Sequence, residues 1–345
     1  MAKLFFLLSG EHPTLPFSEL KAILEAEGYT YQALEKLSQV LRLQAPSESV
    51  EAVASKAAMT RVCCLELFNC DAVEKEILQR LHITSLEGFI ERGESFAVRI
   101  RRIEVAATHV NRGELERKLG EQILRKVEGT TVNLRIPKKT FFGVLTENRF
   151  VFGLKVAEVL PKPFVERSPH RRPFFHPTAL HAKLARCMVN LVEPKAGELV
   201  LDPFCGTAGL LVEAGLIGCR VLGFDVRRRM VEGSLRNLTY YGVKPEGMIV
   251  ADARHPPVRE VNCVVTDPPY GRSATTLGSS TEQIVRDFLL AAQESIKKGC
   301  RVCMASPKSI RIGRIGKESG FRHVESHLVY VHRGLTREIA VFERD

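Results

Sequence analysis

Short apolar runs separated by polar turns fill the first 70 residues, and their periods alternate between two and about 3.6 residues. Period-two runs predict strands, and apolar residues three or four positions apart predict helices, as with Leu20, Ile23 and Leu24 before Gly28. We expect strands at 3–9, 29–34, 40–45 and 61–68, with helices at 16–27 and 47–58. The order is therefore β-α-β-β-α-β.

That order is typical of a ferredoxin-like module, which we place at residues 1–60. A second α+β unit is expected at 61–158. Its predicted helices cover 71–82 and 112–127, and its predicted strands cover 95–102, 132–136, 140–146 and 149–158. The last two strands should form a hairpin around Glu147-Asn148. By pattern alone this is a small α+β domain with basic strand edges, and a structural or dimerisation module is the alternative.

Strands and helices alternate from residue 178 to the last residue, 345. Strands are expected at 199–201, 221–224, 248–250, 261–265, 301–305, 321–332 and 338–343, with helices at 180–192, 209–216, 231–241 and 281–298. Alternation of this kind predicts an α/β fold with a doubly wound, mostly parallel sheet.

Residues 159–177 contain five prolines, together with Arg167, Arg171 and Arg172. Prolines at this density predict a semi-rigid, extended spacer, and we place the domain boundary here. The arginines either follow a phosphate backbone or keep the linker solvated.

The net charge of +10 favours a polyanionic partner. The nine cysteines are scattered, and the one C-x-x-C motif, Cys300 to Cys303, has no second pair or histidine cluster beside it, so we expect no metal site. No stretch approaches the roughly 18 apolar residues of a membrane span. We expect a cytoplasmic protein, and we take a monomer with no identified protein partner as the simplest case.

Four acids each follow a short apolar strand: Asp202, Asp225, Asp252 and Asp267. The carboxyl ends of parallel strands lie at one edge of a doubly wound sheet, where ligands bind. The loop after the first strand reads D-P-F-C-G-T-A-G rather than G-x-G-x-x-G, so pyrophosphate binding and a nicotinamide-dependent dehydrogenase are disfavoured. Alternatively, each acid taken singly caps a helix or a turn.

The segment Thr266 to Gly271 reads T-D-P-P-Y-G. Its prolines end the strand and stiffen the following turn. The Asp267 carboxylate and the Pro268 carbonyl could accept both hydrogens of an exocyclic amino group, and Tyr270 could stack on the base. A structural turn with a surface tyrosine is the simpler alternative.

S-adenosylmethionine fits this set of acids, because its sulfonium and its amino group are favoured near carboxylates. Asp225 would bind the ribose hydroxyls and Asp252 the adenine amino group. Cys205 lies in the cofactor loop and is a poor candidate for a covalent nucleophile.

Residues 174–345 resemble the Rossmann-fold amino-methyltransferases that use S-adenosylmethionine, with DPFCGTAG as cofactor loop and TDPPYG as catalytic loop. The resemblance implies catalytic roles for Asp267, Pro268, Pro269 and Tyr270. It implies cofactor binding by His176, Pro177, Asp202, Phe204, Cys205, Gly206, Thr207, Asp225, Val226, Asp252, Ala253 and Asp267. Ala208 stands where the family more often has glycine, and we expect this difference to matter little.

The basic strands SFAVRIRR, VNLRIPKKTFFGVL and RFVFGLKV resemble the THUMP domain, an RNA-binding module of tRNA-modifying enzymes. The RNA-binding residues implied are Arg99, Arg101, Lys138, Lys139, Arg167, Arg171 and Arg172. The whole chain resembles the archaeal tRNA (guanosine-10 N2)-methyltransferase family. That resemblance implies tRNA as substrate, a THUMP domain that holds the tRNA 3′ end, and one or two methyl groups on N2.

Two alternatives stay open. The first is an N2-guanine methyltransferase for ribosomal RNA or for another tRNA site, because the catalytic loop identifies an amino group rather than a particular base. The second is an RNA-binding protein that keeps the methyltransferase fold without catalysis, although the intact acids and the intact D-P-P-Y segment speak against it.

Overall fold

The computed structural model describes residues 1–269 and 280–345, so Tyr270 of the predicted catalytic loop lies outside the described residues. The chain forms two compact units. The first comprises Met1–Pro13, Gly28–Ala54 and Thr60–Val159, and the second comprises Thr14–Glu27, Ser55–Met59 and Leu160–Asp345. Among the helices of the described residues, none has the length and apolar character that a bilayer crossing requires.

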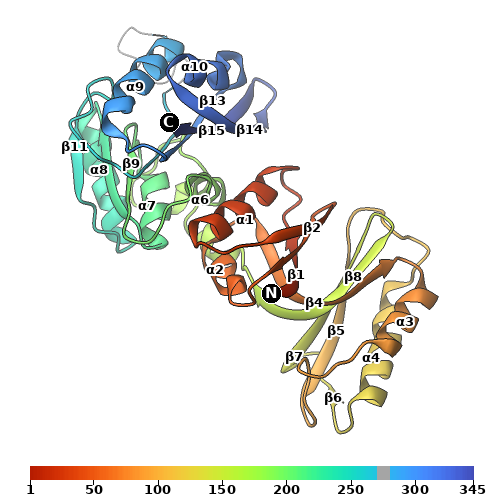
Figure 1. Cartoon of the computed structure of the whole chain (residues 1–345). Coiled ribbons are helices and arrows are strands. Elements are labelled where there is room, and N and C mark those ends of the chain that lie inside the picture. The colour runs from red at the N-terminus through yellow and green to blue at the C-terminus, as the bar shows by residue number, and fades with distance from the viewer. Residues whose placement is uncertain (270–279) are drawn as a thin grey trace. The chain divides into compact units, whose positions relative to one another are not determined.

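The first unit contains one eight-stranded sheet in the order β2-β3-β1-β4-β8-β7-β5-β6 (Figure 1). Its strands are β1 (Ala2–Leu8), β2 (Gln32–Leu37), β3 (Val40–Ala45), β4 (Thr60–Asp71), β5 (Ser95–Arg102), β6 (Thr131–Val132), β7 (Lys139–Thr146) and β8 (Arg149–Glu158). The helices of this part of the chain are α2 (Ser49–Lys56), α3 (Glu74–Ile83) and α4 (Arg112–Lys126). The predicted β-α-β-β-α-β order and the β7–β8 hairpin are both present.

Two expectations for the first unit need correction. The boundary expected at residue 60 does not divide the sheet, because β4 pairs with β1 along one edge and with β8 along the other. The strand expected at 132–136 is only Thr131–Val132. Beyond it, Leu134 and Ile136 are 62% and 82% exposed, so no burial holds that segment in the sheet.

The second unit contains a seven-stranded sheet in the order β11-β10-β9-β12-β13-β15-β14. Its strands are β9 (Leu199–Asp202), β10 (Arg220–Asp225), β11 (Gly247–Val250), β12 (Cys263–Thr266), β13 (Arg301–Pro307), β14 (Phe321–His332) and β15 (Leu335–Arg344). Its helices are α1 (Leu15–Ala26), α5 (Lys162–Glu166), α6 (Ala182–Leu191), α7 (Gly209–Leu216), α8 (Arg228–Tyr240), α9 (Thr281–Ser295) and α10 (Ile312–Glu318). The first five strands are parallel, and the β14–β15 hairpin adds antiparallel to β13.

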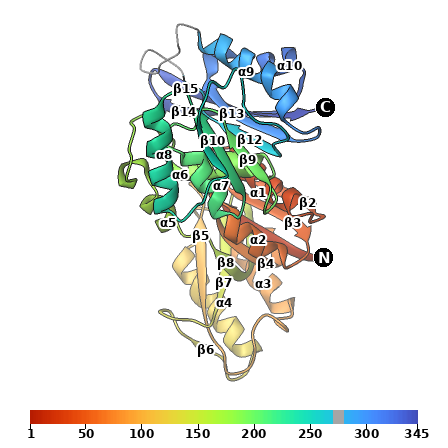
Figure 2. The same ribbon diagram turned by 90° about the vertical axis from the view of Figure 1, so that its left-hand side faces the viewer.

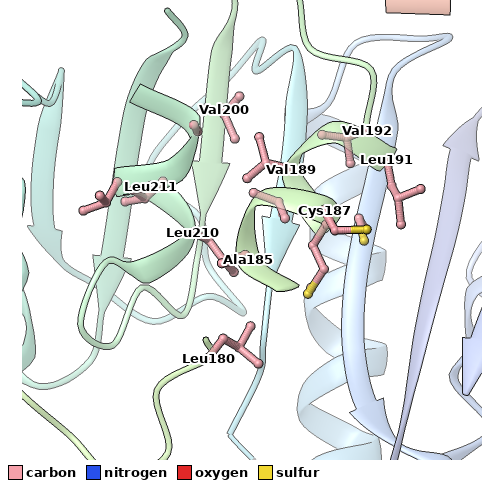
Figure 3. Packing of buried hydrophobic residues seen from close by; sticks show 14 of the residues in the cluster. Leu180, Ala185, Cys187, Val189, Leu191, Val192, Val200, Leu210 and Leu211 are labelled. Carbon is pink, nitrogen blue, oxygen red and sulfur yellow. The ribbon is translucent and has the colours of Figure 1, made fainter. Parts of the chain in front are cut away.

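Alternate residues of the central strands enter two different cores, as expected for a sheet buried on both faces. Val200 belongs to one core with residues of α6, α7 and α8, whereas Leu201 belongs to the other with residues of α9 and α10. Figure 1 and Figure 2 show these helices around the sheet. Figure 3 shows the first of these cores, where Ala185 and Val189 of α6 lie near Leu210 of α7 and Val200 of β9. The doubly wound sheet is thus a three-layer structure.

The expected extended linker at 159–177 belongs to the second unit from Leu160 onward and is partly helical. It contains α5 and a 3₁₀ turn at Pro169–Arg171, and Phe164 of α5 packs against the α6–α7 core. Helix α1 also belongs to this unit, although we predicted it as part of the N-terminal module. Its Glu19 is fully buried and accepts hydrogen bonds from the Ala58 and Met59 amides and from Asn190 of α6.

Candidate active site

The strand order of the second unit reverses between β9 and β12. From β9 the chain continues outward through β10 and β11, and it then returns to add β12 and β13 on the opposite side. Such a reversal leaves a crevice at the carboxyl ends of the strands. Asp202 ends β9 and Asp267 directly follows β12, so these two acids lie on either side of that crevice.

A cavity of about 710 Å³ opens at this point. Every predicted cofactor residue lines it, as do Asp267, Pro268 and Pro269. Further lining residues, which are not among the predicted catalytic or cofactor-binding residues, include Thr178, His181, Arg227, Met230, Arg254, Ile284, His332 and Arg337. Within the described residues, no group of histidines, cysteines and acids is placed to hold a metal ion.

Asp202 is the most deeply buried acid of the cavity, at 2% exposure. Its Oδ1 accepts hydrogen bonds from the Thr266 hydroxyl at 2.6 Å and from the Phe204 amide at 3.1 Å. Burial raises the pKa of Asp202 to about 7, and the nearby charges of Asp267 and Asp225 act in the same direction. A positively charged group is therefore favoured beside this carboxyl.

Asp225 shapes the loop between β9 and α7. Its two carboxylate oxygens accept from the Gly206 amide at 3.2 Å and from the Arg227 amide at 2.9 Å. Gly206 and Ala208 both have left-handed backbone conformations, with φ of 51° and 59°. A residue with a Cβ rarely adopts this conformation, whereas glycine adopts it freely. Alanine at position 208 therefore strains the backbone more than we expected.

Each of the three other acids has an arginine near its carboxylate. Arg227 and Arg254 follow Asp225 and Asp252 by two positions, at 3.8 Å and 2.7 Å. For Asp252, hydrogen bonds from Arg254 lower the pKa of the carboxyl. The arginine near Asp267 comes instead from β15: Nη2 of Arg337 lies 3.9 Å from Asp267 Oδ2.

Comparison with known proteins agrees with this geometry. The family model UPF0020, described as an RMKL-like methyltransferase domain, matches residues 169–339. The chain is 37% identical, over 99% of both chains, to the tRNA (guanine(10)-N2)-dimethyltransferase of Methanothermobacter thermautotrophicus. It is 31% identical to the Methanocaldococcus jannaschii protein of the same name, over 98% of this chain and 99% of that one.

The chain belongs to the tRNA (guanine(10)-N2)-dimethyltransferase family. Among solved structures, TrmN from Thermus thermophilus superimposes with a TM-score of 0.55 at 20% identity, over 99% of this chain and 100% of that one. At that level of identity the likeness concerns the fold alone, which is the Rossmann-like methyltransferase fold predicted from the sequence.

In this member of the family, the segment that carries His176 and Pro177 is fixed to α8. The amide and the carbonyl of Phe174 both bond to the Asn237 side chain at 2.9 Å, and Asn237 also donates to the Thr207 carbonyl in the cofactor loop. The Phe174 ring covers Gly233, where a Cβ would lie only 2.1 Å from Cδ1. One buried asparagine therefore joins the His176 segment to the cofactor loop, and both of these line the cavity.

Two arginines predicted to bind RNA are structural in this methyltransferase. Arg172 is 5% exposed and donates to the Thr207 hydroxyl and to the Arg167 and Leu180 carbonyls. Arg167 binds both carboxylate oxygens of Glu213, which is fully buried in α7. The buried guanidinium of Arg172 cannot reach a phosphate backbone, so that prediction is wrong. RNA binding by Arg167, whose side chain is 14% exposed, and by the exposed Arg171 stays a prediction.

The remaining predicted RNA-binding residues lie on β5 and near β7 of the first unit. Arg99 donates to the carbonyls of Val98 and Leu134, and Lys138 pairs with Glu94 at 2.9 Å. Arg101 is exposed, and Lys139 begins β7. Their role in RNA binding stays a prediction.

Proposed function

We propose that this protein methylates N2 of guanosine 10 in tRNA, with one or two methyl groups as the product. The observation that carries the proposal is the convergence of four strand-end acids and of the Asp267-Pro268-Pro269 turn on one cavity. S-adenosylmethionine is the methyl donor and, when bound, supplies a methyl group on a positively charged sulfur.

The residues of the cavity suit that donor. Asp225 would accept the ribose hydroxyls and Asp252 the adenine amino group, while the buried Asp202 favours the cationic methionine end. This site is held by hydrogen bonds before any ligand arrives: Asn237 joins the Phe174 segment to the cofactor loop, and Asp225 binds the Gly206 amide of the same loop. Pre-formed sites lose less conformational entropy when a ligand binds.

Asp267 and the Pro268 carbonyl would accept the two N2 hydrogens of a guanine flipped into the cavity. This arrangement aligns the amino nitrogen with the methyl group, and such positioning supplies most of the rate gain. After transfer the proton leaves N2 for solvent water, so no strong general base is required. Tyr270 would stack on the guanine ring.

Cys205 takes no covalent part in this proposal. Its thiol is 3% exposed, and burial raises its pKa well above the usual range. The neutral thiol is a weak nucleophile. Its Sγ lies 3.7 Å from the Ser234 hydroxyl, in the packing beneath the cofactor loop.

Binding of S-adenosylmethionine should become tighter as the pH rises through 7. Asp202 has a pKa of about 7 in the free protein, and only its ionised form attracts the cationic ligand. Between pH 6 and 7.5 the Kd should fall roughly eightfold, measured by calorimetry. In the Asp202→Asn variant the Kd should be higher and nearly independent of pH over this range. If the Kd of that variant still falls as the pH rises, the pH dependence belongs to a histidine of the cavity rather than to Asp202.

Gly233→Ala should weaken binding of S-adenosylmethionine about tenfold while the fold persists. Alanine is favoured over glycine inside a helix by about 1 kcal/mol, which offsets part of the local clash. The new methyl group must still displace the Phe174 ring and with it the segment that carries His176. The matched control is Gly120→Ala in α4 of the first unit, where a Cβ meets open space. Equal Kd values for both variants would show that Phe174 does not fix the cavity wall.

We further propose that the first unit binds tRNA through a THUMP-like surface on β5 and β7, and that it holds the 3′ end. The supporting residues are Arg99, Arg101, Lys138 and Lys139, together with the resemblance of these strands to the THUMP domain. We place the enzyme in the cytoplasm, where tRNA is its partner, and we propose that it acts as a monomer.

The decisive experiment is transfer of labelled methyl from S-adenosylmethionine to unmodified tRNA transcript, to ribosomal RNA and to double-stranded DNA in parallel. Nucleosides from digested product would be identified and mapped by mass spectrometry. We expect N2-methylated guanosine at position 10 and no label in a transcript that carries adenosine there. If label appeared only in ribosomal RNA or at another tRNA position, the proposed substrate would be wrong, and the labelled RNA would be the substrate instead. Bound cofactor with no label in any substrate would favour the non-catalytic alternative.

A further inference from the structure

One arginine near Asp267 comes from the β14–β15 hairpin, a part of the chain to which the proposed function gives no role. Arg337 lies 70 positions after Asp267 in the sequence, yet its guanidinium is 3.9 Å from Asp267 Oδ2. The two side chains are 13% and 15% exposed, and both residues line the cavity. This contact is therefore part of the site rather than of the outer surface.

The sheet itself places Arg337 there. β15 runs antiparallel to β13, with Arg337 opposite Pro307, so the beginning of β15 lies beside the carboxyl end of β13. The parallel strands β12 and β13 end at the same edge of the sheet. On the other side of β15, Arg337 lies opposite Val329 of β14. Strand pairing on both sides fixes the backbone from which the guanidinium extends.

A cation is favoured at this point because the cavity is acidic. Asp267 faces Asp202, whose pKa its charge raises, and Asp225 contributes to the same field. Like charges in one cavity disfavour ionisation of all of them, and a guanidinium within about 4 Å of one carboxylate opposes that effect.

We propose that Arg337 is a positioning residue that keeps the Asp267 carboxylate ionised and oriented toward the target amino group. The inference rests on the proposed function, in which Asp267 accepts an N2 hydrogen. An arginine that bound only the RNA backbone would affect the KM for tRNA and its salt dependence, and would leave the ionisation of Asp267 unchanged.

The test compares Arg337→Met, Arg337→Lys and Arg333→Met in methyl transfer to tRNA transcript between pH 5.5 and 9. Arg333 lies in the same hairpin, is exposed and does not line the cavity, so it controls for the loss of one positive charge. The other titratable or charged residues of the cavity are common to all variants: His176, His181, Asp202, Asp225, Arg227, Asp252, Arg254 and His332.

For Arg337→Met we expect kcat to fall about 10- to 100-fold, because a small misplacement of a positioned group costs up to about that factor. The acidic limb of its kcat profile should move up by about one pH unit or more, because loss of a neighbouring cation raises the pKa of a carboxyl. In Arg337→Lys and in Arg333→Met the acidic limb of the kcat profile should lie at the wild-type pH. The Kd for S-adenosylmethionine should stay close to the wild-type value throughout.

Two outcomes would overturn the proposal. The first is an acidic limb that does not move in Arg337→Met. The second is a rise in the KM for tRNA with an unchanged kcat, which would make Arg337 an RNA contact. If the wild-type enzyme itself labels no tRNA, the proposed function fails instead, and the two failures are thereby distinguished.

Discussion

Asp267→Ala should bind S-adenosylmethionine and transfer almost none of its methyl group. The carboxylate is the acceptor that the proposed function assigns to the target amino group, and the other acids of the cavity remain in this variant. We expect kcat to fall on the order of 100- to 1000-fold, as when a single preorganised hydrogen-bonding group is removed from an active site. The Kd for the cofactor, measured by calorimetry, should change much less.

Asp267→Asn is the matched control for that variant. The amide keeps one oxygen acceptor and the approximate shape of the side chain but loses the charge, so its kcat should lie between those of the wild type and of the alanine variant. Near-normal methylation by Asp267→Ala would remove Asp267 from the mechanism. A loss of cofactor binding equal to the loss of kcat would make it a binding residue only.

The sequence predicted this part of the site because the relevant signals are local. Each of the four acids ends a strand or follows one within two residues, and parallel strands bring such positions to one edge whatever the details of packing. The arginines at 227 and 254 could have been found in the same way, from their constant spacing of two residues after an acid. The proximity of Arg337 to Asp267 could not have been predicted from the sequence, because it depends on antiparallel pairing of a hairpin that follows the parallel strands.

The linker was misjudged for a related reason. Five prolines and three arginines between 159 and 177 are typical of an exposed spacer, and the sequence alone does not reveal an acceptor in a distant helix. Glu213 lies 46 residues after Arg167 and is fully buried. Helix α1 was assigned to the wrong unit because adjacency in sequence suggested the N-terminal sheet, whereas its buried Glu19 is satisfied by Asn190 and by the chain at 58–59.

Glu213 is the buried carboxylate on which this arginine network depends. Its Oε1 accepts from Arg167 at 2.7 Å, and its Oε2 accepts from Arg186 at 2.8 Å. The side chains of these arginines are only 14% and 5% exposed, so water cannot replace a lost carboxylate. Both guanidinium groups also lie over the Phe164 ring, at 4.9 Å and 5.9 Å from its centroid. One glutamate therefore joins α5, α6 and α7 beneath the cofactor loop.

Glu213→Ala should destabilise the second unit by about 3–5 kcal/mol, because it leaves buried positive charge without its partner. The unfolding of this unit would be followed by denaturant titration with a bound-cofactor signal as the probe. The matched control is Glu318→Ala in α10, where an exposed glutamate also pairs with two arginines, Arg286 and Arg314. Exposed ion pairs are screened by solvent, so this control should change stability little. Equal stability of the two variants would show that the buried network is not what holds α5 and α6 to α7.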